Sequence, residues 1–167
     1  RSYLAGLNVC IQVFYDPLAK LIDEDQLNDI FSNIKQIKLA NERFLIDLEE
    51  STMTVGQLFK RMSPFFKIYT EYVKNYDIAV ASIERLQNEN KKFAQFLERQ
   101  YALPQINNQR MTSYLILPVQ RIPRYRLLLQ DLLRRTPEEH VDFLNLTLAE
   151  KEVSKVASFV NESKRKE

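Results

Sequence analysis

Hydrophobic residues recur at steps of three and four along most of the chain, which is the spacing of one face of an α-helix. These runs predict helices over residues 1–21, 29–48, 54–101 and 114–133, and a last helix that begins near Thr136. In the fourth run the apolar positions are Leu115, Val119, Ile122, Leu129, Leu132 and Leu133. The pattern therefore predicts an all-α protein, an elongated bundle of about five long helices and several short ones.

Polar and proline residues mark the expected ends of these helices. Thr54 with Gln57 three residues later fits a capping box. Thr136, followed by Pro137 and Glu139, fits the start of the last helix. Two other prolines lie within hydrophobic runs, so a kink is expected at Asp16-Pro17 and a restart of the helix at Pro64.

The composition narrows the class of protein. Hydrophobic residues make up 45% of the 167 residues and charged residues 28%, which is typical of a globular domain. The two glycines favour helices over many short strands. One cysteine and one histidine exclude an intrachain disulfide and argue against a metal site or a Ser-His-Asp triad. The free cysteine favours a reducing compartment, and no apolar run is long enough to span a bilayer.

The charge pattern points to one segment. The whole chain has a net charge of only +2, which does not favour nucleic acid as a partner. Between Val119 and Arg135, however, five arginines accompany a single acid, Asp131. Ile116, Gln120 and Arg124 follow one another at steps of four, so on one helix they would form a row. Such a face is either an interaction surface or simply a solvated side of the helix.

This segment resembles a known family. Residues 117–129, Leu-Pro-Val-Gln-Arg-Ile-Pro-Arg-Tyr-Arg-Leu-Leu-Leu, are similar to the third signature region of Dbl homology (DH) domains, the helical exchange factors for Rho-family small GTPases. Residues 1–18 resemble the first signature helix and residues 69–76 the second. The resemblance covers residues 1–167, so a single DH domain is expected. In the family a glutamate precedes the position of Tyr3, which places this chain just after it, and a pleckstrin homology (PH) domain usually follows.

The resemblance implies a function without covalent chemistry. DH domains bind the GTPase between its switches and promote release of GDP, so that GTP can replace it. No cofactor or metal of the protein's own is implied. Four residues match family positions that contact the GTPase: Ile116, Gln120, Arg124 and Asn161. Ile116 matches a position that helps to select the substrate, which favours a Rac-like GTPase, whereas Arg121 is interpreted as an internal brace.

Two alternatives stand beside exchange activity. The first is a non-catalytic module that docks a GTPase on the same fold, motivated by the absent glutamate. The second is a helical scaffold of the membrane-shaping kind, which the near balance of 24 basic and 22 acidic residues disfavours. The expected location is the cytoplasm, with recruitment to membranes through an adjacent PH domain. For stability, Leu128, Leu129, Leu132 and Leu133 are expected to face inward, with Leu129 the deepest.

Overall fold

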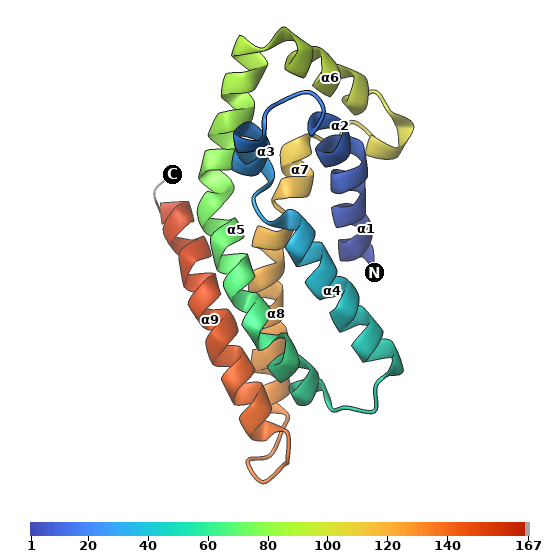
Figure 1. Cartoon of the computed structure of the whole chain (residues 1–167). Coiled ribbons are helices and arrows are strands. Elements are labelled where there is room, and N and C mark those ends of the chain that lie inside the picture. Colours follow the sequence, from blue (N-terminus) through green and yellow to red (C-terminus); the bar gives the residue numbers. More distant parts are fainter. Residues whose placement is uncertain (166–167) are drawn as a thin grey trace. The chain divides into compact units, whose positions relative to one another are not determined.

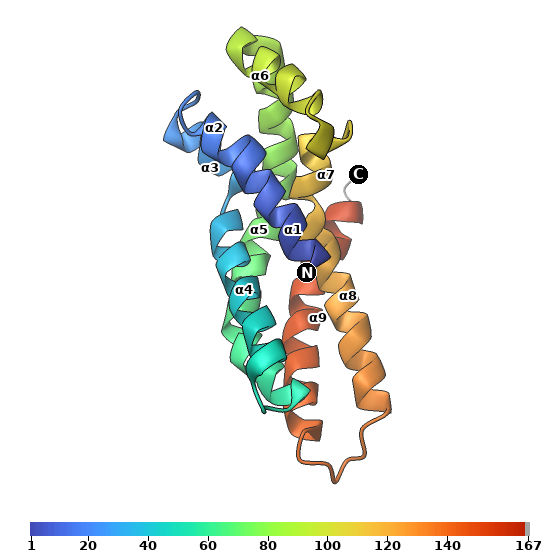
Figure 2. The same ribbon diagram turned by 90° about the vertical axis from the view of Figure 1, so that its right-hand side faces the viewer.

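The computed structural model describes the backbone of residues 1–165 and the side chains of residues 1–160, and it is helical nearly throughout (Figures 1 and 2). Its helical elements are, in order, α1 (Ser2–Val9), the π-helix η1 (Cys10–Tyr15), α2 (Asp16–Leu18), α3 (Glu24–Phe31), α4 (Ile34–Glu50), α5 (Val55–Glu89), α6 (Lys91–Tyr101), the 3-10 helix η2 (Pro104–Ile106), α7 (Met111–Leu115), α8 (Leu117–Arg134) and α9 (Phe143–Arg165). No strand occurs within residues 1–165. The predicted all-α class is confirmed, and the five longest helices are α4, α5, α6, α8 and α9.

The chain divides into two compact units, each with its own core. Unit 1 comprises Arg1–Lys35 and Asn75–Leu117, and unit 2 comprises Gln36–Lys74 and Pro118–Glu167. The fully buried side chains of unit 1 include Leu7, Phe14, Phe31, Phe93 and Leu115. Those of unit 2 include Phe59, Phe66, Tyr69, Ile122, Leu129 and Val153. In unit 2, α9 runs antiparallel to α8, and a loop joins the two helices (Figure 1).

The first helical run contains the distortion expected at Asp16-Pro17. Pro17 has no N–H to donate to the carbonyl of Val13 one turn earlier. The helix widens here into the π-helical stretch Cys10–Tyr15. The side chain of Gln100, on α6, donates to the Val13 carbonyl at 2.7 Å. A side chain from a distant part of unit 1 thus supplies the donor that the proline removes.

The sequence missed two helix breaks and wrongly predicted one. The run over residues 29–48 is interrupted at Ser32, whose φ of 47° and ψ of −127° cannot continue a helix. The run over residues 54–101 is interrupted at Asn90, whose Oδ1 accepts from the N–H of Phe93 at 3.1 Å and so begins α6. Pro64, in contrast, lies inside α5 and does not restart it. Pro64 leaves the Lys60 carbonyl without its usual donor, and it does so on the exposed side of α5, where both residues lie.

The caps of unit 2 only partly follow the sequence. The capping box at the start of α5 is confirmed, because Thr54 and Gln57 exchange hydrogen bonds of 3.0 and 3.2 Å. The expected cap at Thr136 is wrong: its hydroxyl donates to the Leu132 carbonyl at 2.7 Å and closes the end of α8. Helix α9 begins later, at Phe143.

A clasp joins the start of α9 to the start of α5. The buried carboxylate of Asp142 accepts from the Thr54 hydroxyl at 2.6 Å and from the Gly56 N–H at 2.7 Å. Asn145 donates to the same carboxylate at 3.3 Å. Burial works to raise the pKa of Asp142, but these hydrogen bonds, with His140 nearby, outweigh it and hold the pKa below its ordinary value. The loop before α9 thus supplies an anion to the N-terminus of α5, where the helix dipole favours negative charge.

Candidate partner-binding face

Helix α8 presents Gln120 and Arg124 on its solvent side. Both side chains are exposed, and they lie one helical turn apart. The opposite side of the helix is buried, with Ile122 and Leu129 fully inaccessible. Among the side chains of residues 1–160, neither Gln120 nor Arg124 makes a hydrogen bond or an ion pair. Burial of the inner side therefore leaves an amide and a guanidinium available to a partner.

The same side of α8 carries a hydrophobic residue that the sequence analysis missed. Leu127 is 65% exposed and lies one turn beyond Arg124. Leu128, expected to face inward, is 46% exposed, so that prediction is wrong, whereas Leu129 is buried as expected. Successive helical residues are about 100° apart, so three leucines in a row cannot all face the core. The spacing of Gln120, Arg124 and Leu127, by four and then three, could have shown that Leu127 lies on the same side of the helix. These three residues are called the outer face of α8 below.

Three other arginines of this segment have different surroundings. Arg134 and Arg135 both pair with Asp131, at 3.4 and 3.7 Å, on a well-solvated part of the helix. The guanidinium of Arg121 lies 4.8 Å from the centre of the Tyr125 ring. Arg121 is half-buried, and this stacking supports its interpretation as an internal brace. Arg124 therefore differs from these three in presenting its charge on the outer face of α8.

Two of the predicted site residues do not belong to α8. Ile116 is the half-buried C-cap of α7, and α8 begins only at Leu117. The expected single row of Ile116, Gln120 and Arg124 on one helix is therefore wrong at its first member, which belongs to unit 1, whereas Gln120 and Arg124 belong to unit 2. The backbone of Asn161 lies in α9, and its side chain lies outside the described residues.

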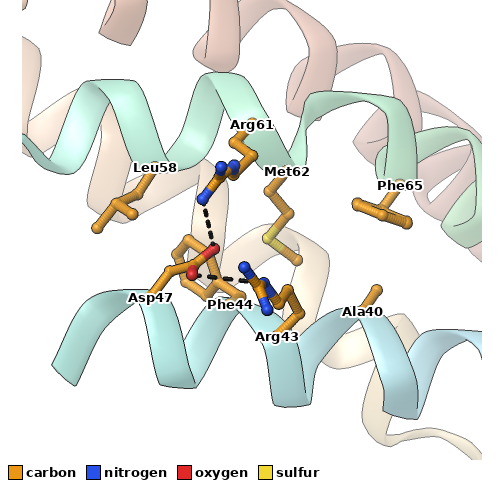
Figure 3. Close-up of a pocket in the computed structure, with 8 residues that line it drawn as sticks. All are labelled: Ala40, Arg43, Phe44, Asp47, Leu58, Arg61, Met62 and Phe65. Carbon is orange, nitrogen blue, oxygen red and sulfur yellow. Dashed lines mark hydrogen bonds and ion pairs between the residues drawn. The ribbon is translucent and has the colours of Figure 1, made fainter. Parts of the chain in front are cut away.

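Unit 2 also has a pocket between α4 and α5 (Figure 3). Its carboxylate, Asp47, lies between Arg43 and Arg61, at 3.5 and 3.3 Å, and apolar side chains that include Phe44 and Met62 also line the pocket. Its interior volume of about 20 Å³ has room for little more than one water molecule. Ligand sites for small molecules are usually at least ten times larger. The ion pair between Arg61 and Asp47 joins α5 to α4 here, and the pocket is too small for a substrate.

The described part of the chain has neither a metal-binding cluster nor a membrane-spanning helix. Residues 1–160 hold no cluster of three or more His, Cys, Asp or Glu side chains that could bind a metal ion. Across the helices described, none combines the length and the hydrophobicity needed to cross a membrane. The outer face of α8 thus remains the strongest candidate for a functional surface.

Comparisons with known proteins agree on one family. The profile described as RhoGEF domain matches residues 1–161. The chain is 34% identical to the Rac guanine nucleotide exchange factor JJ of Dictyostelium discoideum, over 98% of this chain and 15% of that protein. It is 32% identical to the human FYVE, RhoGEF and PH domain-containing protein 4, over 99% of this chain and 23% of that protein. A solved structure of the linker and DH/PH domains of p115-RhoGEF superposes with a TM-score of 0.83 at 21% identity, covering 96% of this chain and 51% of that one.

Proposed function

Because the chain belongs to the RhoGEF domain family, we propose that it is a guanine nucleotide exchange factor for a Rho-family small GTPase. The observation that carries the proposal is the outer face of α8. Gln120 and Arg124 match the family's contact positions, and both are exposed on a rigid helix whose other side is buried. A side chain can contact a partner protein only if it is exposed in this way.

The proposed mechanism is a binding equilibrium and involves no covalent step. If the protein binds the nucleotide-free GTPase more tightly than the GDP-bound form, nucleotide binding must weaken by the same factor. Arg124 supplies a charge to the second switch, Gln120 supplies hydrogen bonds, and Leu127 supplies apolar area. Arginine is enriched among the few residues that carry most of the binding energy at protein interfaces.

The finer parts of the proposal concern the identity of the partner and the protein's setting. A Rac-like GTPase is favoured, since Ile116 matches the family position that helps to select the substrate and one relative is named a Rac exchange factor. Asn161 is proposed to contact the second switch as well. The chain spans only 15–23% of the two relatives' lengths, so the activity of the whole protein also forms part of the proposal. We place that protein in the cytoplasm, with a PH domain beside this one for membrane recruitment.

The test is Arg124→Ala, measured by release of fluorescent nucleotide and by binding to a small panel of nucleotide-free Rho-family GTPases that includes Rac-like and Rho-like members. Loss of a charged anchor costs about 2 kcal/mol or more, which lowers exchange by roughly 30-fold. Because Arg124 is exposed, its replacement should change stability by less than about 0.5 kcal/mol. The matched control is Arg99→Ala, which removes the same charge from an exposed position on α6.

Equal exchange by these two variants would contradict the assignment of the outer face of α8. A protein that binds the nucleotide-free GTPase without accelerating release would instead be a docking module. The Rac preference is tested separately with Ile116→Leu. Exchange rates are measured on Rac and on a Rac variant in which the Trp that distinguishes the GTPase branches is replaced by Phe. The substitution should change the ratio of the two rates. A methylene-sized misfit at such a position is worth roughly 1–3 kcal/mol.

A further inference from the structure

A buried hydrogen-bond network connects α8 to α4 and α5 within unit 2. The Tyr125 hydroxyl, on α8, donates to Oδ1 of Asn41, on α4, at 3.0 Å. Nδ2 of Asn41 donates to the Tyr69 hydroxyl, on α5, at 2.8 Å, and to the Ile37 carbonyl at 2.8 Å. Tyr69, Asn41 and Tyr125 are all buried.

The geometry of this network admits one arrangement. Asn41 uses both amide hydrogens and its oxygen, so turning the amide over would place its oxygen against the Ile37 carbonyl. Tyr125 must then donate, and burial raises the pKa of its hydroxyl above the ordinary value, although Arg121 partly opposes this. The hydroxyl therefore keeps its proton at physiological pH and remains a donor.

This network bears directly on the outer face of α8. Tyr125 directly follows Arg124, and neighbouring residues of a helix point about 100° apart. The ring of Tyr125 also packs edge-on against Phe59 and Phe44, with centroids 5.9 and 6.4 Å away. A hydrogen bond is directional, so the bond from Tyr125 to Asn41 adds a restraint on the rotation of α8 to that of the apolar packing. The direction in which Arg124 leaves the helix depends on that rotation.

We propose that Tyr125 and Asn41 are positioning residues for partner binding: their hydrogen bond, anchored by Tyr69, holds α8 in the rotation that presents Gln120 and Arg124 to the GTPase. This inference rests on the proposed function and adds residues that do not touch the partner. A partner binds only the fraction of molecules in the competent orientation. If loss of the bond reduces that fraction to about one tenth, the apparent affinity falls about tenfold.

The experiment compares Tyr125→Phe with Ile122→Val, each alone and combined with Arg124→Ala. Tyr125→Phe keeps the ring and removes only the hydroxyl. Ile122→Val is a control on the same buried side of α8 that lowers stability and leaves the network intact. The dissociation constant for nucleotide-free GTPase and the unfolding midpoint are measured for every variant.

A positioning role predicts about a tenfold weaker affinity for Tyr125→Phe and less than a twofold change for Ile122→Val. The effect of Tyr125→Phe must also become smaller once Arg124 is alanine, because only Gln120 is then left to position. If Tyr125 is purely structural, Tyr125→Phe will lower the unfolding midpoint but change the affinity no more than Ile122→Val does. That result would overturn the inference. The inference is also overturned if Tyr125→Phe weakens the affinity equally in the protein with Arg124 and in the Arg124→Ala variant.

Tyr69→Phe provides a second variant if Tyr125→Phe does not fold. It removes the acceptor for the Asn41 amide and keeps the bond between Tyr125 and Asn41, so a smaller loss of affinity in the same direction is expected. Unchanged affinity in a folded Tyr69→Phe protein would refute the role of the anchor. The two proposals fail in different ways: Arg124→Ala without effect refutes the contact assignment, whereas an effect of Arg124→Ala without one of Tyr125→Phe refutes only the positioning role.

Discussion

Replacing Gly56 by alanine should destabilise the protein, although alanine is normally the better helical residue. Gly56 is in the first turn of α5, directly beneath the carboxylate of Asp142. A Cβ added there would lie 2.3 Å from Oδ1 and 2.5 Å from Cγ of Asp142. Both distances are far inside van der Waals contact, so the carboxylate must move away. It then loses the donors Thr54 and Gly56, now at 2.6 and 2.7 Å.

The magnitude follows from these two hydrogen bonds. Each hydrogen bond to a charged group contributes about 1.5–3 kcal/mol, so losing both costs about 3–6 kcal/mol. The better helix propensity of alanine returns up to about 1 kcal/mol. The net loss is about 2–6 kcal/mol, or a fall in melting temperature of roughly 4–24 °C for a chain of this size.

The assay is urea unfolding at neutral pH, followed by far-UV circular dichroism, for Gly56→Ala alone and together with Asp142→Ala. Once the carboxylate is absent, Gly56→Ala has nothing to displace and should become neutral or stabilising by up to about 1 kcal/mol. The sign of the effect is therefore expected to reverse between the two backgrounds. If Gly56→Ala stabilises the protein that retains Asp142, the clasp does not hold α5 as described.

Three further predictions can be checked by unfolding measurements. Leu129→Ala should cost roughly 2–5 kcal/mol and Leu128→Ala much less, so similar midpoints would refute the assignment of the buried side of α8. Ser32→Gly should raise stability by up to about 2 kcal/mol, because glycine adopts the φ of 47° without strain, and a lower melting temperature would contradict this. The carboxylate of Asp142 has a lowered pKa, so the stability it contributes is complete above the unfolded value of about 3.9 and is lost as the pH falls through the folded value. Stability measured against pH should fall less steeply at the acid end for Asp142→Asn, and identical curves would exclude this carboxylate as the cause.

The helices could be predicted from the sequence because their signal is local. A hydrophobic step of three or four reports the buried side of one helix, and it correctly identified Leu129 as buried. The break at Asn90 left no trace in that pattern, since the apolar face continues on both sides of it. Ser32 was missed for the same reason. Leu128 was wrongly expected to face inward, because hydrophobicity alone does not say which of the three leucines from 127 to 129 is buried.

The contacts that join helices could not be predicted in this way. Asp142 and Gly56 are 86 positions apart, and Tyr125 and Asn41 are 84 apart. No periodicity connects such residues, and Thr136 offered a more obvious local cap than Asp142 did. For the candidate site, the sequence identified the exposed residues Gln120 and Arg124 through a family resemblance. Tyr125 and Asn41, which orient them, cannot be told apart from other buried residues by the sequence pattern.

The clasp at Asp142 also has a consequence for the newly made chain. Synthesis proceeds from the N-terminus at about 5–20 residues per second. Asp142 follows Gly56 by 86 residues, so the start of α5 exists for roughly 4–17 s before its capping carboxylate is made. Throughout that interval α5, the longest helix among the described residues, has an incomplete cap and no α9 to cover it. A nascent chain in this state exposes apolar surface, which makes it prone to aggregation.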